Sequence, residues 1–239
     1  MNPIHLGICK LCYTLVGGVS FLFFVACLNP APALEITFSV PETSELLINA
    51  SESDGGVANV IGIIGGKGLR NSYGRSRNYL VKQKHIFVQS GLNFYLLPNR
   101  SNKELAEFPL RNSRKRAKRI LALVRAIRNR SAKPVFIVGF SRGSVDAGTF
   151  AKLYPDEIAG IAIVSGVYTN TSRKAEAYSM ELVIGQKIDV PVVVAHHEED
   201  ACTVTPFWYA KSFFDSLKAP SKSILSYRGG SGNGRACGP

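Results

Sequence analysis

Residues 134–144 read Pro-Val-Phe-Ile-Val-Gly-Phe-Ser-Arg-Gly-Ser. A run of β-branched and aromatic residues leads directly into the pentapeptide Gly-Phe-Ser-Arg-Gly at 139–143, and a helical pattern follows until Pro155. A turn this tight has no room for side chains two residues before and after its centre, and Gly139 and Gly143 meet that requirement. The segment therefore predicts a buried strand, a sharp turn with Ser141 exposed at its tip, and a helix.

A serine held in this way is placed to act as a nucleophile. The positive end of the helix dipole and the backbone N–H of Arg142 would stabilise negative charge on a substrate carbonyl oxygen. A G-x-S-x-G pentapeptide arises by chance in roughly one chain in five of this composition. Its weight here comes from the strand, turn and helix around it, which favour catalysis by Ser141.

A second oxyanion donor is expected from the loop after an earlier central strand. Residues 60–68, Val-Ile-Gly-Ile-Ile-Gly-Gly-Lys-Gly, form such a strand and end in glycines. The N–H of Gly66 or of Lys67 would complete the oxyanion hole with that of Arg142. The alternative for this loop is a phosphate-binding site, which needs the spacing of a Walker or Rossmann motif, and neither fits.

An acidic residue that orients a catalytic base should follow a later strand, at the same edge of the sheet. Residues 191–200, Pro-Val-Val-Val-Ala-His-His-Glu-Glu-Asp, end such a strand. Three residues compete for the role, namely Glu198, Glu199 and Asp200. Because the two glutamates also suit a charged loop tip, Asp200 is the predicted acid.

Along the chain, short β-rich runs alternate with longer segments of helical period, which predicts an α/β fold with a mostly parallel sheet. The expected strands are Glu35–Val40, Val57–Ile64, Leu92–Leu97, Val135–Gly139, Ile161–Ser165, Val190–Ala195 and Ser223–Tyr227. The clearest helix spans 113–130, with one apolar stripe and basic residues on the rest of its surface. This basic run lacks aromatic residues and any nucleic-acid motif. We therefore interpret it as a solvated outer face, with weak contact to an anionic envelope surface as the alternative and no nucleic-acid partner.

The composition supports one folded domain. The 239 residues are 46% hydrophobic and 19% charged, with a net charge of +12, which excludes disordered, collagen-like and coiled-coil chains. We assign residues 34–239 to this domain. Neither composition nor motif calls for a metal, nucleotide or other cofactor.

Residues 1–33 are expected to be an export signal. An almost uncharged apolar run from Leu11 to Cys27 precedes Ala-Pro-Ala at 31–33, small residues that suit a signal peptidase cutting before Leu34. The predicted location is the periplasm or the medium. Two alternatives are lipidation at Cys27, which follows Phe-Val-Ala, and an uncleaved membrane anchor, for which the run is short.

Taken together, these motifs make the chain resemble the exported bacterial α/β-hydrolases. Members of this family pair a Gly-Gly-x-Gly loop with a Gly-x-Ser-Arg-Gly turn, and in this chain these motifs lie at 65–68 and 139–143. They also carry the motif His-His-x-x-Asp-x-Cys, which lies here at 196–202. The resemblance implies a mostly parallel central sheet with helices on both faces, and Asp200 as the acid. It also implies a disulfide between Cys202 and Cys237, which an oxidising compartment would allow. The implied activity is that of an esterase-like serine hydrolase on a small-molecule ester, thioester or amide.

The chain departs from this pattern at the catalytic base. In that pattern the histidine follows the second cysteine, whereas this sequence ends two residues after Cys237, so we expect a chain truncated before its base. His196 and His197 lie on the acid's own loop, where they are badly placed to bridge Asp200 to Ser141. The alternative function is therefore a catalytically impaired remnant, or a binding protein of the same fold.

Overall fold

The structure is a computed structural model of the chain, and it describes residues 34–40, 46–52, 55–69, 78–99, 110–168 and 179–229. All described residues belong to one compact unit, Pro32–Pro239. The predicted export signal, including Cys27, lies outside the described residues, and so does Cys237. Within the described ranges, no helix has the length and apolar character needed to cross a membrane.

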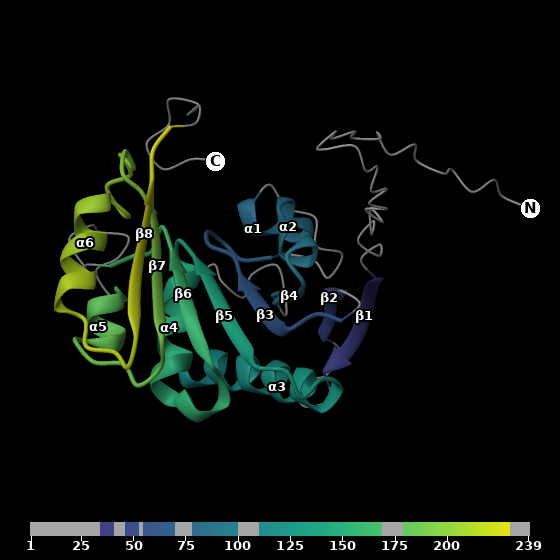
Figure 1. Cartoon of the computed structure of the whole chain (residues 1–239). Coiled ribbons are helices and arrows are strands. Elements are labelled where there is room, and N and C mark those ends of the chain that lie inside the picture. Colours follow the sequence, from purple (N-terminus) through teal and green to yellow (C-terminus); the bar gives the residue numbers. More distant parts are fainter. Residues whose placement is uncertain are drawn as a thin grey trace, which may run out of the picture. The chain divides into compact units, whose positions relative to one another are not determined.

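The described strands form one eight-stranded sheet in the order β1-β2-β4-β3-β5-β6-β7-β8 (Figure 1). They are β1 (Leu34–Val40), β2 (Leu46–Glu52), β3 (Ala58–Ile63), β4 (Leu92–Leu96), β5 (Val135–Phe140), β6 (Gly160–Val164), β7 (Val192–His197) and β8 (Lys222–Tyr227). The six strands from β4 to β8 in this order pair in parallel. β1 and β2 are antiparallel to their neighbours. The predicted α/β class with a mostly parallel sheet is confirmed.

One strand escapes prediction from the sequence. The apolar residues of β2 are its first three and Ala50, and the strand ends in Asn-Ala-Ser-Glu at 49–52, so it has neither a continuous apolar run nor a strict alternation. It forms because its backbone pairs with β1 on one side and with β4 on the other. The pairing partners, rather than its own β-propensity, determine its conformation.

Helices cover both faces of the sheet. They are α1 (Tyr79–Lys82), α2 (Lys84–Gln89), α3 (Arg114–Arg130), α4 (Gly143–Leu153), α5 (Met180–Ile184) and α6 (Phe207–Ser216), with a 3₁₀ turn η3 (Pro155–Glu157). Successive side chains of β3 point to opposite faces. Val60 joins a core cluster with α1 and α2, whereas Ile61 and Ile63 join the larger cluster that contains α3, α4 and α6.

The predicted helix at 113–130 is confirmed as α3, which Ser113 caps through its hydroxyl by accepting from Arg116 N–H at 3.2 Å. The interpretation of its basic residues as a solvated face is wrong for three of them. Arg111, just before the helix, is 2% exposed, Arg116 is 1% exposed and Arg119 is 8% exposed. Buried guanidinium groups need acceptors, and Arg116 has Asp146 while Arg119 has the Pro98 carbonyl.

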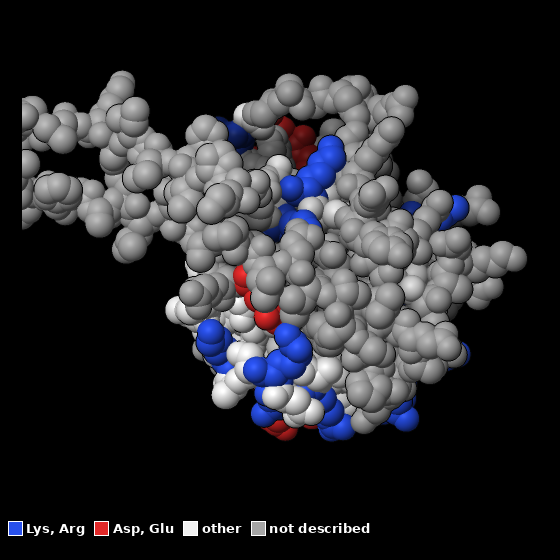
Figure 2. Space-filling view, turned by 90° about the vertical axis from the view of Figure 1, so that its right-hand side faces the viewer, with Lys and Arg blue, Asp and Glu red and all other residues white. Residues whose placement is uncertain are grey.

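Other basic residues of α3 do face solvent, Arg114, Lys115 and Lys118 among them. Arg125 and Arg128 are also exposed, and both form ion pairs with Glu157. On the molecular face in Figure 2, most of the coloured charged residues are Lys or Arg. Contact with an anionic envelope surface stays a prediction.

Candidate active site

The sequence between β5 and α4 forms the predicted tight turn from strand to helix, but Ser141 at its centre is half-buried rather than exposed. Ser141 directly follows β5 and has a φ of +53°, a conformation that a residue with a side chain adopts only under local constraint. A Cβ on Gly139 would lie 2.5 Å from the Gly143 carbonyl oxygen, and one on Gly143 would lie 2.1 Å from that of Ile63. Both neighbours are backbone atoms, so no rotamer change could relieve either contact.

Hydrogen bonds hold this turn in place. Ser141 N–H donates to the Val164 carbonyl at 2.8 Å, which ties the turn to the end of β6. The hydroxyl of Ser144 donates to the Ser141 carbonyl at 2.7 Å and accepts from Val167 N–H at 3.1 Å. Ser144, which sequence reasoning did not single out, therefore links the turn to the chain after β6.

The glycine loop lies against Ser141. Gly68 N–H donates to the Gly65 carbonyl at 3.0 Å, closing a β-turn with Gly66 and Lys67 at its centre. Gly66 has a φ of +57° and Lys67 does not have a positive φ, the signs of a type II′ turn. A Cβ on Gly65 would lie 2.7 Å from the Ser141 Cβ. The structure thus brings together Ser141 and the loop that carries Gly66 and Lys67, while Arg142 precedes the first residue of α4.

Asp200 lies beyond the end of β7, at the same edge of the parallel strands as Ser141. Its carboxylate accepts hydrogen bonds from Cys202 N–H at 2.9 Å, from the Thr205 hydroxyl at 3.2 Å and from His196 Nε2 at 3.1 Å. The side chain keeps 18% of its surface exposed. A carboxylate fixed by three donors and still open to the sheet edge suits an orienting role.

His196 is fully buried, and its partners determine its tautomer. Nε2 lies 2.7 Å from the Thr205 carbonyl, which only accepts, so this nitrogen carries the proton and shares it with Asp200. Nδ1 then accepts from the Tyr168 hydroxyl at 3.4 Å. Burial raises the pKa of Tyr168, which keeps that hydroxyl protonated. His196 therefore helps to hold the Asp200 carboxylate in place by donating a hydrogen bond to it.

The other described histidines are engaged elsewhere or lie on the surface. His197 Nε2 donates to the Gly229 carbonyl at 2.7 Å, and its Nδ1 accepts from Glu199 N–H at 3.0 Å. His85 is exposed on α2. Within the described ranges, no histidine forms a hydrogen bond with Ser141.

The two glutamates that compete with Asp200 have other surroundings. Glu198 accepts from the Ser226 hydroxyl at 2.7 Å and pairs with Arg228, so it joins the acid loop to β8. The Ser226 hydrogen bond, followed by Arg228, lowers the pKa of Glu198. Glu199 donates its N–H to His197. Neither carboxylate has the set of donors that holds Asp200.

The expected disulfide has one of its two cysteines among the described residues. Cys202 is 8% exposed beside Asp200, but its expected partner Cys237 lies outside the described residues, so the disulfide stays a prediction. Among the described residues, no group of three His, Cys, Asp or Glu side chains could hold a metal ion.

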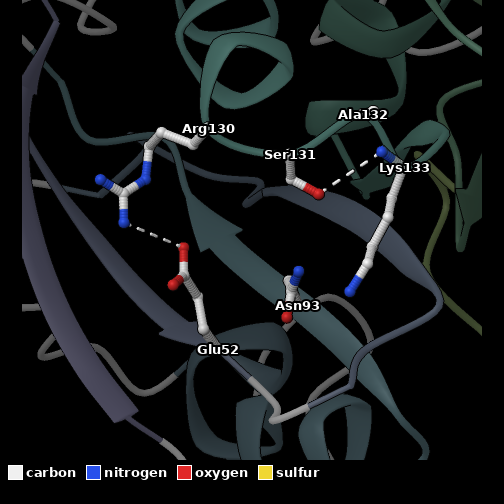
Figure 3. Close-up of a pocket in the computed structure, with 6 residues that line it drawn as sticks. All are labelled: Glu52, Asn93, Arg130, Ser131, Ala132 and Lys133. Atoms are coloured by element: carbon white, nitrogen blue, oxygen red, sulfur yellow. Dashed lines mark hydrogen bonds and ion pairs between the residues drawn. The ribbon is translucent and has the colours of Figure 1, made fainter.

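A cavity of about 720 Å³ lies far from this edge, at the opposite ends of the parallel strands (Figure 3). It is lined by Glu52, Asn93 and residues 130–133, which precede β5. Two of these lining residues form an ion pair, since the Arg130 guanidinium reaches the Glu52 carboxylate at 3.4 Å. Since Ser141 follows the other end of β5, this cavity does not belong to the candidate active site.

No family model matches the sequence, and no curated protein does. Solved structures do match in fold. An α/β serine hydrolase homologue from Coxiella burnetii has a TM-score of 0.55 at 14% identity, over 82% of this chain and 87% of the other. Dienelactone hydrolase from Anabaena variabilis has a TM-score of 0.56 at 16% identity, over the same shares. Est1E from Butyrivibrio proteoclasticus has a TM-score of 0.54 at 13% identity, over 83% and 89%. The chain therefore has the fold of the α/β-hydrolases.

Proposed function

We propose that the chain belongs to a serine hydrolase that cleaves a small ester, thioester or amide through a covalent acyl-enzyme. The main support for this proposal is the conformation of Ser141, which has a φ of +53° between β5 and α4 and has the glycine loop packed against it. A residue with a side chain needs support from its surroundings to hold this conformation, and at Ser141 the glycines at 65, 139 and 143 make room for it. The α/β-hydrolase fold is consistent with a hydrolase but does not identify the substrate.

The proposed reaction has two stages. Ser141 Oγ attacks the carbonyl carbon while its proton passes to an imidazole, and the carbonyl oxygen becomes an oxyanion. The N–H of Arg142 and that of Gly66 or Lys67 would stabilise this oxyanion. The tetrahedral intermediate then expels the alcohol, thiol or amine, which takes the proton from the imidazole. Water releases the acyl group by the same steps, and Asp200 orients the imidazole throughout.

The imidazole is the part of this machinery that the described residues do not supply. His196 uses both ring nitrogens in the hydrogen bonds behind Asp200, and His197 uses both of its own at the end of β8. We propose that the base is a histidine encoded after Pro239. Without it, Ser141 would remain a poor nucleophile near pH 7.

The test compares three proteins in the hydrolysis of p-nitrophenyl esters: the 239-residue chain, the chain continued into its downstream coding sequence, and that continued chain with Ser141→Ala. The short chain should show only the acceleration of roughly 10³ over water that binding and an oxyanion hole leave behind. The continued chain should be faster by orders of magnitude, and Ser141→Ala should abolish that gain.

Ser165→Ala is the matched control, because Ser165 follows the neighbouring strand β6 and also has a positive φ, of +43°. It should keep the activity of the continued chain. Two results would contradict the proposal. An inactive continued chain would favour a binding protein of this fold, and a short chain that matches the continued one would place the base within the sequence printed here.

The proposed enzyme is exported, and it loses residues 1–33 by cleavage before Leu34. The apolar run and the small residues at 31–33 support this part of the proposal. N-terminal sequencing of the mature protein tests it. A chain that still begins at Met1 would contradict export by this route, and a lipidated Cys27 at the new terminus would replace cleavage before Leu34 with a lipid anchor.

A further inference from the structure

A buried ion cluster lies behind the glycine loop. Asp146 of α4 has a fully buried side chain and pairs with two guanidinium groups, since Arg111 contacts Oδ2 and Arg116 Nε donates to Oδ1 at 2.8 Å. Arg111 and Arg116 are 2% and 1% exposed. Buried ion pairs rarely add more stability than apolar side chains of the same volume would. This cluster therefore calls for a role beyond filling the core.

The guanidinium group of Arg111 also contacts the glycine loop. Arg111 Nη2 donates to the Gly66 carbonyl at 3.0 Å and to the Ile64 carbonyl at 3.3 Å, while Nη1 of the same group contacts Asp146. The Arg111 guanidinium thus bridges α4, whose first turn follows Ser141, to the loop on the other side of the serine. A planar group with several fixed donors can make these contacts together, which a lysine ammonium cannot reproduce.

These bonds determine where the peptide groups of the loop point. In a trans peptide the C=O of one residue and the N–H of the next point in opposite directions. With the Gly66 carbonyl held on Arg111, the N–H of Lys67 points away from the guanidinium. The next carbonyl, that of Lys67, accepts from the Asn99 amide at 2.6 Å. Hydrogen bonds therefore fix the carbonyl groups on both sides of the Lys67 N–H, those of Gly66 and of Lys67.

We propose that Arg111 is a positioning residue that orients the Lys67 N–H as the second oxyanion donor, with Asp146 holding the guanidinium. This inference rests on the proposed hydrolase function, and it selects Lys67 over Gly66. Arg111 touches neither substrate nor Ser141 in this scheme. It acts through the Gly66–Lys67 peptide, whose N–H becomes a stronger donor when its carbonyl accepts from a cation.

Two variants separate this role from simple stabilisation of the core. Arg111→Gln and Arg116→Gln each remove one guanidinium from Asp146 at equal burial, but only the first removes the hydrogen bonds to the Ile64 and Gly66 carbonyls. A cooperative thermal unfolding transition in each variant would establish that it folds. Should Arg111→Gln fail to fold, Arg111→Lys replaces it, since a lysine keeps the charge without the planar fork.

Hydrogen exchange measures how firmly the glycine loop is held, and it does not require enzymatic activity. The Gly68 amide, whose bond to Gly65 closes the turn, should exchange about tenfold faster in Arg111→Gln than in Arg116→Gln, because a bond from a charged donor has been lost. Equal exchange in the two variants would overturn the proposal, whatever the chain hydrolyses.

Phosphonylation of Ser141 in the continued chain by a p-nitrophenyl alkylphosphonate measures the effect on the oxyanion donor itself. Its second-order rate constant should fall by about 10- to 100-fold in Arg111→Gln and by less than about threefold in Arg116→Gln, because removing one oxyanion donor costs about 10² or more. Equal losses in the two variants would overturn the proposal. If the continued chain without these substitutions is not labelled, the hydrolase function fails, and the Gly68 exchange alone decides whether Arg111 holds the turn.

Discussion

Alanine at Gly143 tests the geometry of the turn that holds Ser141. A Cβ there would lie 2.1 Å from the Ile63 carbonyl oxygen and 2.9 Å from its carbon. Both are backbone atoms at the end of β3, so α4 and β3 would have to move apart. Overpacking of this kind costs about 1–3 kcal/mol or more, against a gain of at most about 1 kcal/mol in helix propensity. We expect a net loss of about 2 kcal/mol in the free energy of unfolding.

Gly148→Ala, in the same helix, is the control. Its Cβ would lie 2.7 Å from Met180 Cε and 3.0 Å from Ile184 Cδ1, the mobile ends of two side chains. The stability should then change by less than about 1 kcal/mol. For a domain of this size, Gly143→Ala should lower Tm by about 4–8 °C in calorimetry. Equal Tm values for the two variants would refute the reasoning about the turn.

Three further predictions concern the surroundings of Asp200. His196→Asn should destabilise the fold by about 2 kcal/mol, because buried partners lose a hydrogen bond. It should lower the rate of ester hydrolysis by the continued chain less than about tenfold. Full inactivation at unchanged stability would instead make His196 the base. Burial raises the pKa of Tyr168 above its ordinary value of 10. Above pH 10 the phenol therefore ionises first in the unfolded chain, which lowers the free energy of unfolding. Urea unfolding at pH 9 and at pH 11 should show a smaller loss of this free energy at the higher pH for Tyr168→Phe than for the unsubstituted chain. The disulfide between Cys202 and Cys237 would close a loop of about 35 residues and contribute about 3–4 kcal/mol, and mass spectrometry after alkylation should find no free thiol at either residue of the exported protein.

Local patterns predict the centre of this fold well. The turn at Ser141 was predictable because its requirements lie within five residues, with glycines at 139 and 143 and a continuous apolar run before them. Asp200 follows an equally clear buried strand. β2 was not predictable in this way, because its conformation depends on pairing with β1 and β4, which lie elsewhere in the sequence.

The buried arginines show a second limit of local patterns. In the sequence, Arg111 and Arg116 belong to a basic run whose other members are mostly exposed, and no feature of that run distinguishes them. A signal did exist on the partner helix, where Asp146 stands alone among the apolar and small residues of Gly-Ser-Val-Asp-Ala-Gly. A carboxylate in a buried helix requires cationic or hydrogen-bonding partners, but the sequence does not say which of many arginines supplies them.

The central claim is that the fold presents Ser141 as a nucleophile beside backbone oxyanion donors. A crystal structure after long incubation with an excess of a p-nitrophenyl alkylphosphonate tests this claim most directly, since the excess compensates for slow attack in the absence of a base. We predict a phosphorus atom bonded to Ser141 Oγ, with the phosphoryl oxygen about 2.7–3.1 Å from the backbone nitrogens of Arg142 and Lys67. An adduct on another residue, or a phosphoryl oxygen on Ser141 that faces solvent away from both nitrogens, would contradict the account.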